Sequence, residues 1–243
     1  MIKNVSSPSV WVVIPAAGIG KRMKTSRPKQ YLSLLNKTVI EHTLACFSHN
    51  DNIAGIVVSL HPTDPYWAEL NIDIAIPLYV VNGGKERSDS VLNALRFMQK
   101  KLLLDSDAWV MVHDAARPCL LKIDIETLIS TCVSSDKVGG VLAKKVSDTI
   151  KRSQEDDNSI DATENRERLW HALTPQMFHL KQLADALKYS FDQGMAITDE
   201  SSALENISQS PLLVEAEGSN IKITHPDDLA LAEFLLLAKK ENV

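Results

Sequence analysis

Short, nearly continuous apolar runs alternate with amphipathic segments through the first half of the sequence. The apolar runs are rich in β-branched residues and occupy residues 10–14, 55–60, 77–81 and 108–113. Such runs are typical of strands that are covered on both faces of a parallel sheet. The segments between them space apolar residues by three and four, as amphipathic helices do, and occupy residues 39–47, 88–102 and 123–133. The alternation predicts an α/β fold whose mostly parallel sheet has helices on both faces and right-handed crossovers.

The alternation of strand-like and helix-like segments stops near residue 138. The stretch VGGVLAKKVSDTIKRS alternates as an antiparallel strand does, and QEDDNSIDATENRER after it is polar and typical of turns. We interpret residues 143–176 as a β-arm that leaves the main sheet, and helices are expected again from residue 180. No repeat or linker divides the chain, so we expect one domain over residues 1–243 that carries this arm.

Charge and hydropathy argue against several classes of protein. The 243 residues carry 26 Lys and Arg against 31 Asp and Glu, whereas general nucleic-acid binding usually requires a broad basic face. The apolar stretch LALAEFLLLA is interrupted by Glu233 and is too short to span a bilayer. Three cysteines without CxxC spacing favour unpaired thiols in a reducing compartment. We therefore expect a cytoplasmic protein that binds neither nucleic acid nor membranes.

A cluster of cations follows the first predicted strand, although the net charge of the chain is −5. The cluster comprises Lys21, Arg22, Lys24, Arg27 and Lys29. The dinucleotide fingerprint GxGxxG fails here, because Met23 stands where its third glycine belongs. The Walker A pattern also fails, because Pro15 replaces its first glycine and Arg22 its Ser or Thr.

A glycine-containing loop at the carboxyl end of the first strand remains as the interpretation. Ligands bind at this edge of open α/β sheets. Backbone N–H groups near Gly18 and Gly20, together with the cations, suit a polyphosphate. A solvated basic loop without a ligand is the alternative.

Seven stretches of the sequence carry a resemblance to a known family. PAAGIGKRM and PKQYL resemble the signature of cytidylyltransferases that act on sugar and polyol phosphates. The others are GGKERSDSV (83–91), VHDAARP (112–118), LWHALTPQMF (169–178), ITDESSALE (197–205) and NIKITHPDDLALAEF (220–234). In this order they resemble the family of 2-C-methyl-D-erythritol 4-phosphate cytidylyltransferases, over nearly the whole chain.

The resemblance implies a function. Members of the family couple CTP with methylerythritol phosphate to give CDP-methylerythritol and pyrophosphate, in the non-mevalonate route to isoprenoids. They have a Rossmann-like fold, require Mg²⁺ and form homodimers through an extended β-arm. Because the sequence ends just after its last predicted helix, we also expect a monofunctional enzyme, without the cyclodiphosphate synthase to which some members are fused.

By the same resemblance, residues of the loop and of the strand ends contact CTP. Arg22 and Lys29 are expected to stabilise the transition state, and Asp114 of HDAARP to hold Mg²⁺, which prefers oxygen ligands. Asp114 as a simple turn cap is the alternative. The nucleotide-binding positions are Ala16, Ala17, Gly18, Ile19, Gly20, Gly84, Lys85 and Ser90. Lys85 departs from the family, whose members often have an acidic residue there.

The resemblance also implies a site for the second substrate. Arg166 and Lys222 are expected to position its phosphate, with Arg166 supplied in trans by the arm of the partner subunit. The positions that match the pocket around its hydroxyl groups are Asp148, Thr149, Thr174 and Thr198. We expect His113 to be structural and Arg117 to brace the loop rather than to contact phosphate.

Three other functions stay open at this point. A ribitol-5-phosphate cytidylyltransferase shares the PKQ loop and a similar HD-containing motif. An NAD(P)-dependent oxidoreductase would suit an α/β fold but lacks support from the glycine pattern. A nucleotide-sensing module without catalytic activity is the third, because fold alone does not establish activity.

Overall fold

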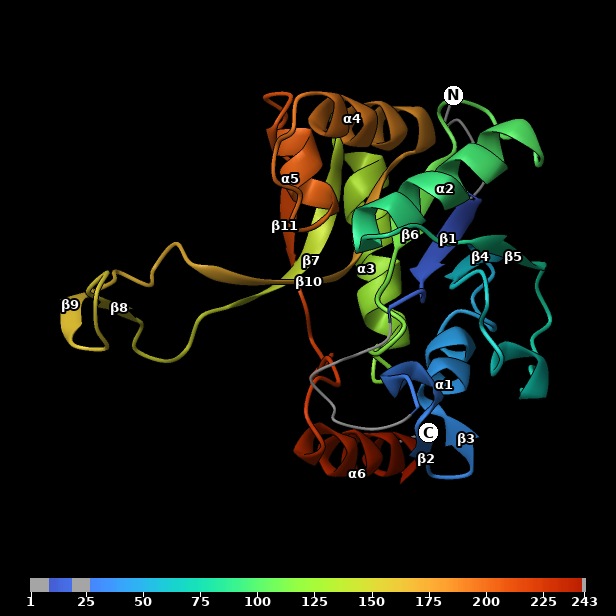
Figure 1. Ribbon diagram of the computed structural model, residues 1–243, viewed down its shortest axis with the longest axis horizontal. Helices are drawn as coiled ribbons and strands as arrows, with labels where there is room; N and C mark the ends of the chain where they lie inside the picture. The colour runs from blue at the N-terminus through green and yellow to red at the C-terminus, as the bar shows by residue number, and fades with distance from the viewer. Residues whose placement is uncertain (1–8, 19–26, 242–243) are drawn as a thin grey trace, which may run out of the picture.

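A seven-stranded sheet forms the centre of the molecule (Figure 1). The computed structural model describes residues 9–18 and 27–241. The strands lie in the order β11-β7-β10-β6-β1-β4-β5. Their bounds are Val10–Pro15 for β1, Ile53–Leu60 for β4, Leu78–Asn82 for β5, Trp109–Val112 for β6, Gly139–Lys145 for β7, Trp170–His179 for β10 and Leu212–Glu215 for β11.

The sheet is mixed and mostly parallel, as the sequence predicts. The ladders β1–β4, β1–β6, β4–β5 and β7–β11 are parallel, and β10 alone runs antiparallel to its neighbours β6 and β7. All four strands predicted from the apolar runs are present, and β1, β4 and β6 lie side by side in the sheet. The predicted α/β fold class is therefore confirmed.

Helices pack on both faces of this sheet. Their bounds are Val39–Ala45 for α1, Arg87–Lys100 for α2, Lys122–Ser134 for α3, Leu180–Asp192 for α4, Glu200–Glu205 for α5 and Asp227–Glu241 for α6. One apolar cluster joins the sheet to α1 and α3, and a second joins it to α2, α4 and α5. A smaller cluster packs α6 near α1. No described helix has the length and hydropathy needed to cross a membrane.

The position of strand β1 between two layers of helices explains why its sequence is almost wholly apolar. Val12 and Ile14 face the cluster with α1 and α3, whereas Val13 faces the cluster with α2 and α4. All three side chains are fully buried. Because successive side chains of a strand point to opposite faces, a strand between two helical layers needs apolar residues at every position.

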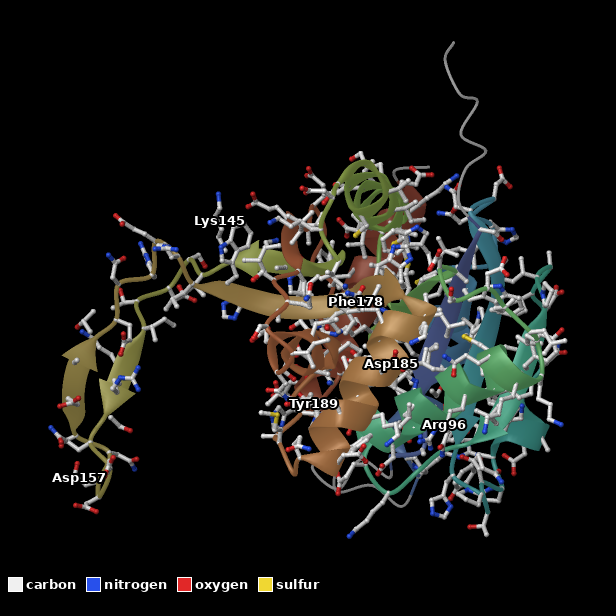
Figure 2. The ribbon with its side chains drawn as sticks, turned by 90° about the horizontal axis from the view of Figure 1, so that it is seen from above. Arg96, Lys145, Asp157, Phe178, Asp185 and Tyr189 are labelled. Carbon is white, nitrogen blue, oxygen red and sulfur yellow. The ribbon has the colours of Figure 1, made fainter. Side chains whose placement is uncertain are left out.

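The arm projects from the body of the molecule (Figures 1 and 2). It contains a small antiparallel sheet of β8 (Lys151–Ser153) and β9 (Ile160–Thr163), and Asp157 lies at the turn between them. The segment that leaves the main sheet is shorter than the 143–176 predicted. Residues 143–145 and 170–172 pair with each other as the ends of β7 and β10.

Candidate active site

A hollow of about 250 Å³ opens at the carboxyl end of β1, beside the start of α2. Segments that are distant in the sequence meet there: the β1 loop, the loop before α2, the residues after β6 and the segment before α6. Many of the predicted site residues line it, namely Ala16, Ala17, Gly18, Lys29, Gly84, Lys85, Ser90, Asp114 and Lys222. Of the other predicted residues, Ile19, Gly20 and Arg22 lie outside the part of the chain that the structure describes.

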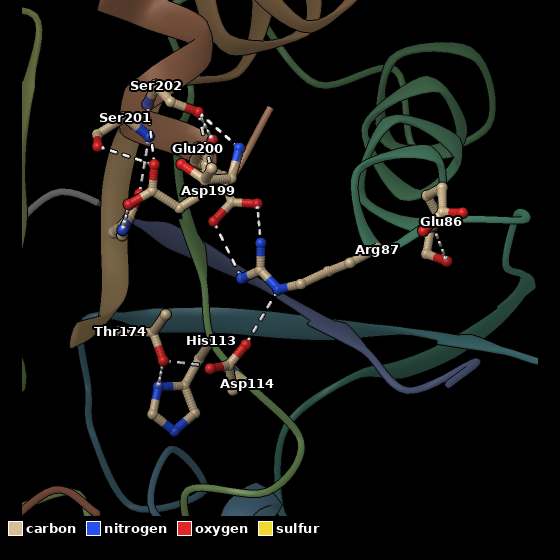
Figure 3. Close-up of polar contacts among 12 residues, drawn as sticks. Glu86, Arg87, His113, Asp114, Thr174, Asp199, Glu200, Ser201 and Ser202 are labelled. Carbon is tan, nitrogen blue, oxygen red and sulfur yellow. Dashed lines mark hydrogen bonds and ion pairs between the residues drawn. The ribbon is translucent and has the colours of Figure 1, made fainter. Parts of the chain in front are cut away.

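Asp114 is the centre of the charged groups in this hollow (Figure 3). It follows β6 and is 6% exposed. Its Oδ1 accepts a hydrogen bond from Arg87 Nε at 3.0 Å, and its Oδ2 lies 3.1 Å from Arg117 Nε and 2.9 Å from Lys222 Nζ. Burial alone would raise the pKa of Asp114, but the charges of Arg87, Lys222 and Arg117 hold that pKa well below its usual range. The site therefore holds a permanently ionised carboxylate among three cations.

His113 and Arg117 brace the turn that presents Asp114, as we expected. His113 is fully buried, and its ring nitrogens lie 3.1 Å from the Arg117 carbonyl oxygen and 3.0 Å from Thr174 Oγ1. Burial lowers the pKa of His113 to about 4, so that its ring is neutral near pH 7. Arg117 Nη1 donates to the Asn220 carbonyl at 2.6 Å. Arg117 thus ties the residues after β6 to the segment that carries Lys222.

Small residues shape the wall of the hollow beside the start of α2. The Gly84 N–H donates to Ser90 Oγ at 3.0 Å. A Cβ added at Gly84 would lie 2.2 Å from Asp89 Cβ, and one at Gly83 would lie 2.5 Å from Ala17 Cβ. Any side chain at these two glycines would push the loop away from α2 and β1, so the close approach of this wall requires glycine.

Gln30 is a residue at this site to which sequence reasoning assigned no role. Its Nε2 donates to the carbonyl oxygens of Ala16 and Gly18, at 2.8 and 3.1 Å, and the side chain is 4% exposed. These bonds tie the short 3-10 helix η2 (Lys29–Tyr31) to the end of β1. The available signal was its position next to Lys29 in the stretch PKQYL.

Two of the predicted lysines of the site, Lys29 and Lys222, come together from opposite ends of the chain. Lys29 Nζ donates to the Ile223 carbonyl at 2.9 Å, and Lys222 Nζ pairs with Asp114. Lys29 therefore reaches the short segment before α6 that carries Lys222, and both lysines line the hollow. Between them they border a space that suits an anion.

Arg87 and Glu200 form an ion pair that sequence reasoning also missed. Besides its bond to Asp114, Arg87 donates from Nη1 and Nη2 to Glu200 Oε1 and Oε2, at 2.6 and 3.0 Å (Figure 3). Glu200, the first residue of α5, is 1% exposed. Both residues lie in the stretches GGKERSDSV and ITDESSALE that carry the family resemblance, which was the only signal for them.

The residues predicted for the second substrate are dispersed in a single chain. Thr174 lies behind Asp114, where its Oγ1 accepts a hydrogen bond from the Asp114 N–H at 3.1 Å. Thr198 borders a second hollow, which Arg87 also lines. Asp148, Thr149 and Arg166 are exposed residues of the arm, and Arg166 Nη1 donates to the Ser147 carbonyl. One chain therefore does not bring the arm residues to the hollow around Asp114.

Comparison with known proteins gives a consistent result. The family model for IspD, 2-C-methyl-D-erythritol 4-phosphate cytidylyltransferase, matches residues 10–238. The enzyme of that name from Vibrio parahaemolyticus is 50% identical over 97% of this chain and 98% of its own length, and that from Alteromonas mediterranea is 48% identical over 97% and 96%. The crystal structure of the Francisella tularensis enzyme is 36% identical, with a TM-score of 0.80 over 93% of this chain and 99% of its own. The chain therefore belongs to the 2-C-methyl-D-erythritol 4-phosphate cytidylyltransferase family and is an enzyme of the cytidylyltransferase class.

Proposed function

We propose that the hollow around Asp114 is where this chain transfers the CMP moiety of CTP to 2-C-methyl-D-erythritol 4-phosphate. The reaction gives CDP-methylerythritol and pyrophosphate and is the activity of the family, in the non-mevalonate route to isoprenoid precursors. The observation that carries the assignment of the site is the ionised Asp114 with three cations in a hollow at the end of β1. Ligand binding at the carboxyl ends of strands is the rule for such sheets.

The chemistry is a displacement at phosphorus. An oxygen of the methylerythritol phosphate group forms a bond to the α-phosphorus of CTP, and the bond from that phosphorus to the pyrophosphate oxygen breaks. Two anions approach each other, and charge develops on the departing pyrophosphate. Catalysis of such a step consists mostly of positioning and electrostatic stabilisation, so that no protein nucleophile is needed.

The residues of the hollow divide this task. Lys29, together with Arg22 of the β1 loop, stabilises the transition state, while Lys222 holds the phosphate of the second substrate. Gly18, Ile19 and Gly20 offer backbone N–H groups to the triphosphate. The cytosine is read by the remaining nucleotide-binding positions, Ala16, Ala17, Gly84, Lys85 and Ser90. The close packing at Gly84 supports this role, because a glycine there lets a ligand approach the backbone.

Asp114 suits Mg²⁺ as a single protein ligand. The carboxylate is ionised, and among the described residues its Oδ1 accepts only the hydrogen bond from Arg87, which leaves a lone pair. The described residues contain no group of three acidic, His or Cys side chains placed to hold a metal ion, so the nucleotide phosphates and water would supply the other ligands. Bound there, Mg²⁺ would neutralise charge on the phosphates. We expect Asp114→Asn, which keeps the shape of the side chain, to need more Mg²⁺ for half-maximal turnover; an unchanged requirement would assign the metal to other groups.

The second substrate requires a homodimer in this proposal. Arg166 of the partner subunit positions the phosphate beside Lys222, and Asp148 and Thr149 come with it from the same arm. Thr174 and Thr198 complete the pocket around the hydroxyl groups. The dispersion of these residues in one chain supports such an exchange, because a two-fold axis would bring each arm to the other subunit's hollow.

A reducing, cytoplasmic location completes the proposal. The three thiols, Cys46, Cys119 and Cys132, are unpaired. Burial raises their pKa values to about 11, 12 and 12, which keeps them protonated and unreactive near neutral pH. Unpaired cysteines are typical of reducing compartments.

Release of pyrophosphate tests the function directly. With CTP and Mg²⁺ we expect turnover with methylerythritol phosphate and much less with ribitol 5-phosphate, the substrate of the nearest rival function. CTP alone should give no release and serves as the control. A preference for ribitol 5-phosphate would mean that this compound, and not methylerythritol phosphate, is the substrate. No release of pyrophosphate with either compound would contradict both the proposed reaction and the assignment of the site.

A further inference from the structure

Arg87 separates the hollow around Asp114 from a second one. The second hollow lies between the start of α2 and the loop before α5, and Thr198 borders it. Arg87 and Glu86 line both. The orientation of the Arg87 guanidinium therefore affects the space for the nucleotide on one side and the space near the second substrate on the other.

Glu200 determines that orientation. Both of its carboxylate oxygens accept from the two Nη atoms of Arg87, which leaves Nε as the atom that reaches Asp114 (Figure 3). Such a two-point pair fixes the plane of a guanidinium as well as its position. Because Glu200 is almost completely buried, its carboxylate has little freedom to follow a moving Arg87.

The start of α5 is itself held in place from the sheet. Gln176 of β10 donates from Nε2 to Asp199 Oδ2 and accepts the Ser201 N–H at Oε1, both at 2.8 Å. Asp199 caps the helix by accepting the Ser202 N–H at 2.9 Å. Glu200 is thus presented to Arg87 from a rigid helix start.

The charges of the cluster show what loss of Glu200 would change. Two carboxylates, Asp114 and Glu200, face three cations. Neutralising Glu200 would leave three positive charges around one carboxylate. It would also break the two-point pair, because an amide offers Arg87 only one acceptor oxygen, so that an Nη donor becomes available to an oxygen of a phosphate group.

We propose that Glu200 is a positioning residue of the reaction, which holds the Arg87 guanidinium so that it neither enters the place of the triphosphate nor takes both oxygens of Asp114. The inference rests on the proposed function. In this role Glu200 lowers the attraction of the site for the bare nucleotide and in return keeps Asp114 and the phosphates in the productive arrangement. A residue that only stabilised the fold would neither lower the affinity for the bare nucleotide nor position the reacting groups.

Glu200→Gln tests the proposal, with Glu205→Gln as its matched control. Both remove one negative charge from α5, but Glu205 is exposed. For Glu200→Gln we expect kcat to fall at least about tenfold at saturating substrates and Mg²⁺, because the reacting groups are less well held. We also expect CTP to bind at least about threefold more tightly in EDTA, measured by calorimetry, because the site is more positive. Glu205→Gln should change neither quantity.

A lower kcat together with tighter binding of CTP distinguishes a positioning role of Glu200 from a role in stability alone. Weaker or unchanged binding of metal-free CTP to a folded Glu200→Gln protein, or an unchanged kcat, would overturn the proposal. If Glu200→Gln does not fold, Arg87→Lys decides, because a lysine keeps the charge but its ammonium group cannot bridge Glu200 and Asp114 in the same way. That variant should lose turnover and bind metal-free CTP as the wild type does; undiminished turnover would contradict the inference. A wild-type chain without pyrophosphate release would instead contradict the proposed function.

Discussion

The hollow around Asp114 and the arm hold their charged residues in opposite ways. Arg117, near the hollow, has a side chain that is 10% exposed and contacts both Asp114 and the Asn220 carbonyl. Arg152, in the arm, has a side chain that is 64% exposed and pairs with Glu164. The hollow is therefore arranged by the fold of one chain, whereas the side chains of β8 and β9 are all exposed.

This difference has a physical consequence for the arm. A two-stranded hairpin is only marginally stable in water by itself. The arm, whose β8 and β9 are exposed along their whole length, would gain contacts when it packs on a second subunit. Side chains that act only after such packing are exposed in their own chain, and Asp148, Thr149 and Arg166 are exposed. The comparison thus predicts different effects for the two regions. Changes at the hollow should lower turnover and the stability of the single chain, whereas changes in the arm should act through the association of two chains.

The largest effect is expected from Lys29→Ala, at the hollow. Loss of one preorganised cation from the transition state typically costs about a hundredfold in kcat, and we expect at least that much. The affinity for CTP should change far less, because other groups also hold the triphosphate. Single-turnover rates and calorimetric titrations with CTP measure the two quantities. Equal losses in both would make Lys29 a ground-state ligand of the nucleotide.

How much of this site could be predicted depended on the distance between partners in the sequence. Residues within contiguous motifs, such as Lys29 and Asp114, could be placed from the resemblance, and the hollow brings them together. Arg87 and Glu200 lie 113 positions apart, and only the fold reveals their pairing. Gln30 contacts backbone carbonyls alone, and the sequence contains no pattern that marks such a contact.

The fold could be predicted to a similar degree and for similar reasons. The buried strand β1 and the helices beside it have the apolar periodicities that burial requires, so that their positions followed from the sequence. The ends of the arm are harder to place from the sequence, because β7 and β10 stay paired with each other as they leave the body. The periodicity of apolar residues indicates which faces of a strand or helix are covered, but it does not indicate where the hydrogen bonding between two strands ends.

A mixture of two inactive variants tests whether the two regions work across subunits. Lys29→Ala and Arg166→Ala should each be nearly inactive alone. If they are unfolded together and refolded in equal amounts, half of the dimers should be mixed, and each mixed dimer should contain one intact site. Pyrophosphate release should then recover to about a quarter of the wild-type value when assembly is random. No recovery, in a mixture shown by mass spectrometry to contain mixed dimers, would place Arg166 in the site of its own chain.

Arg117→Met should reduce stability more than any single change in the arm. It breaks a buried ion pair with Asp114 and leaves the Asn220 carbonyl without its donor. We expect the free energy of unfolding to fall by about 3 kcal/mol, measured by urea denaturation at a low protein concentration. A loss below about 1 kcal/mol would mean that Lys222 and Arg87 hold the Asp114 turn without Arg117.

Arg152→Met makes the same substitution in the arm and should have the smallest effect. Its one ion pair, with Glu164, is largely exposed, and such pairs contribute less than about 1 kcal/mol. At the same low protein concentration we therefore expect a change in the free energy of unfolding of about 0.5 kcal/mol or less. A loss as large as that of Arg117→Met would contradict the contrast between the two regions. Repeating the measurement at increasing protein concentration sharpens it, since a cost that grows with concentration means that Arg152 becomes buried only when two chains associate.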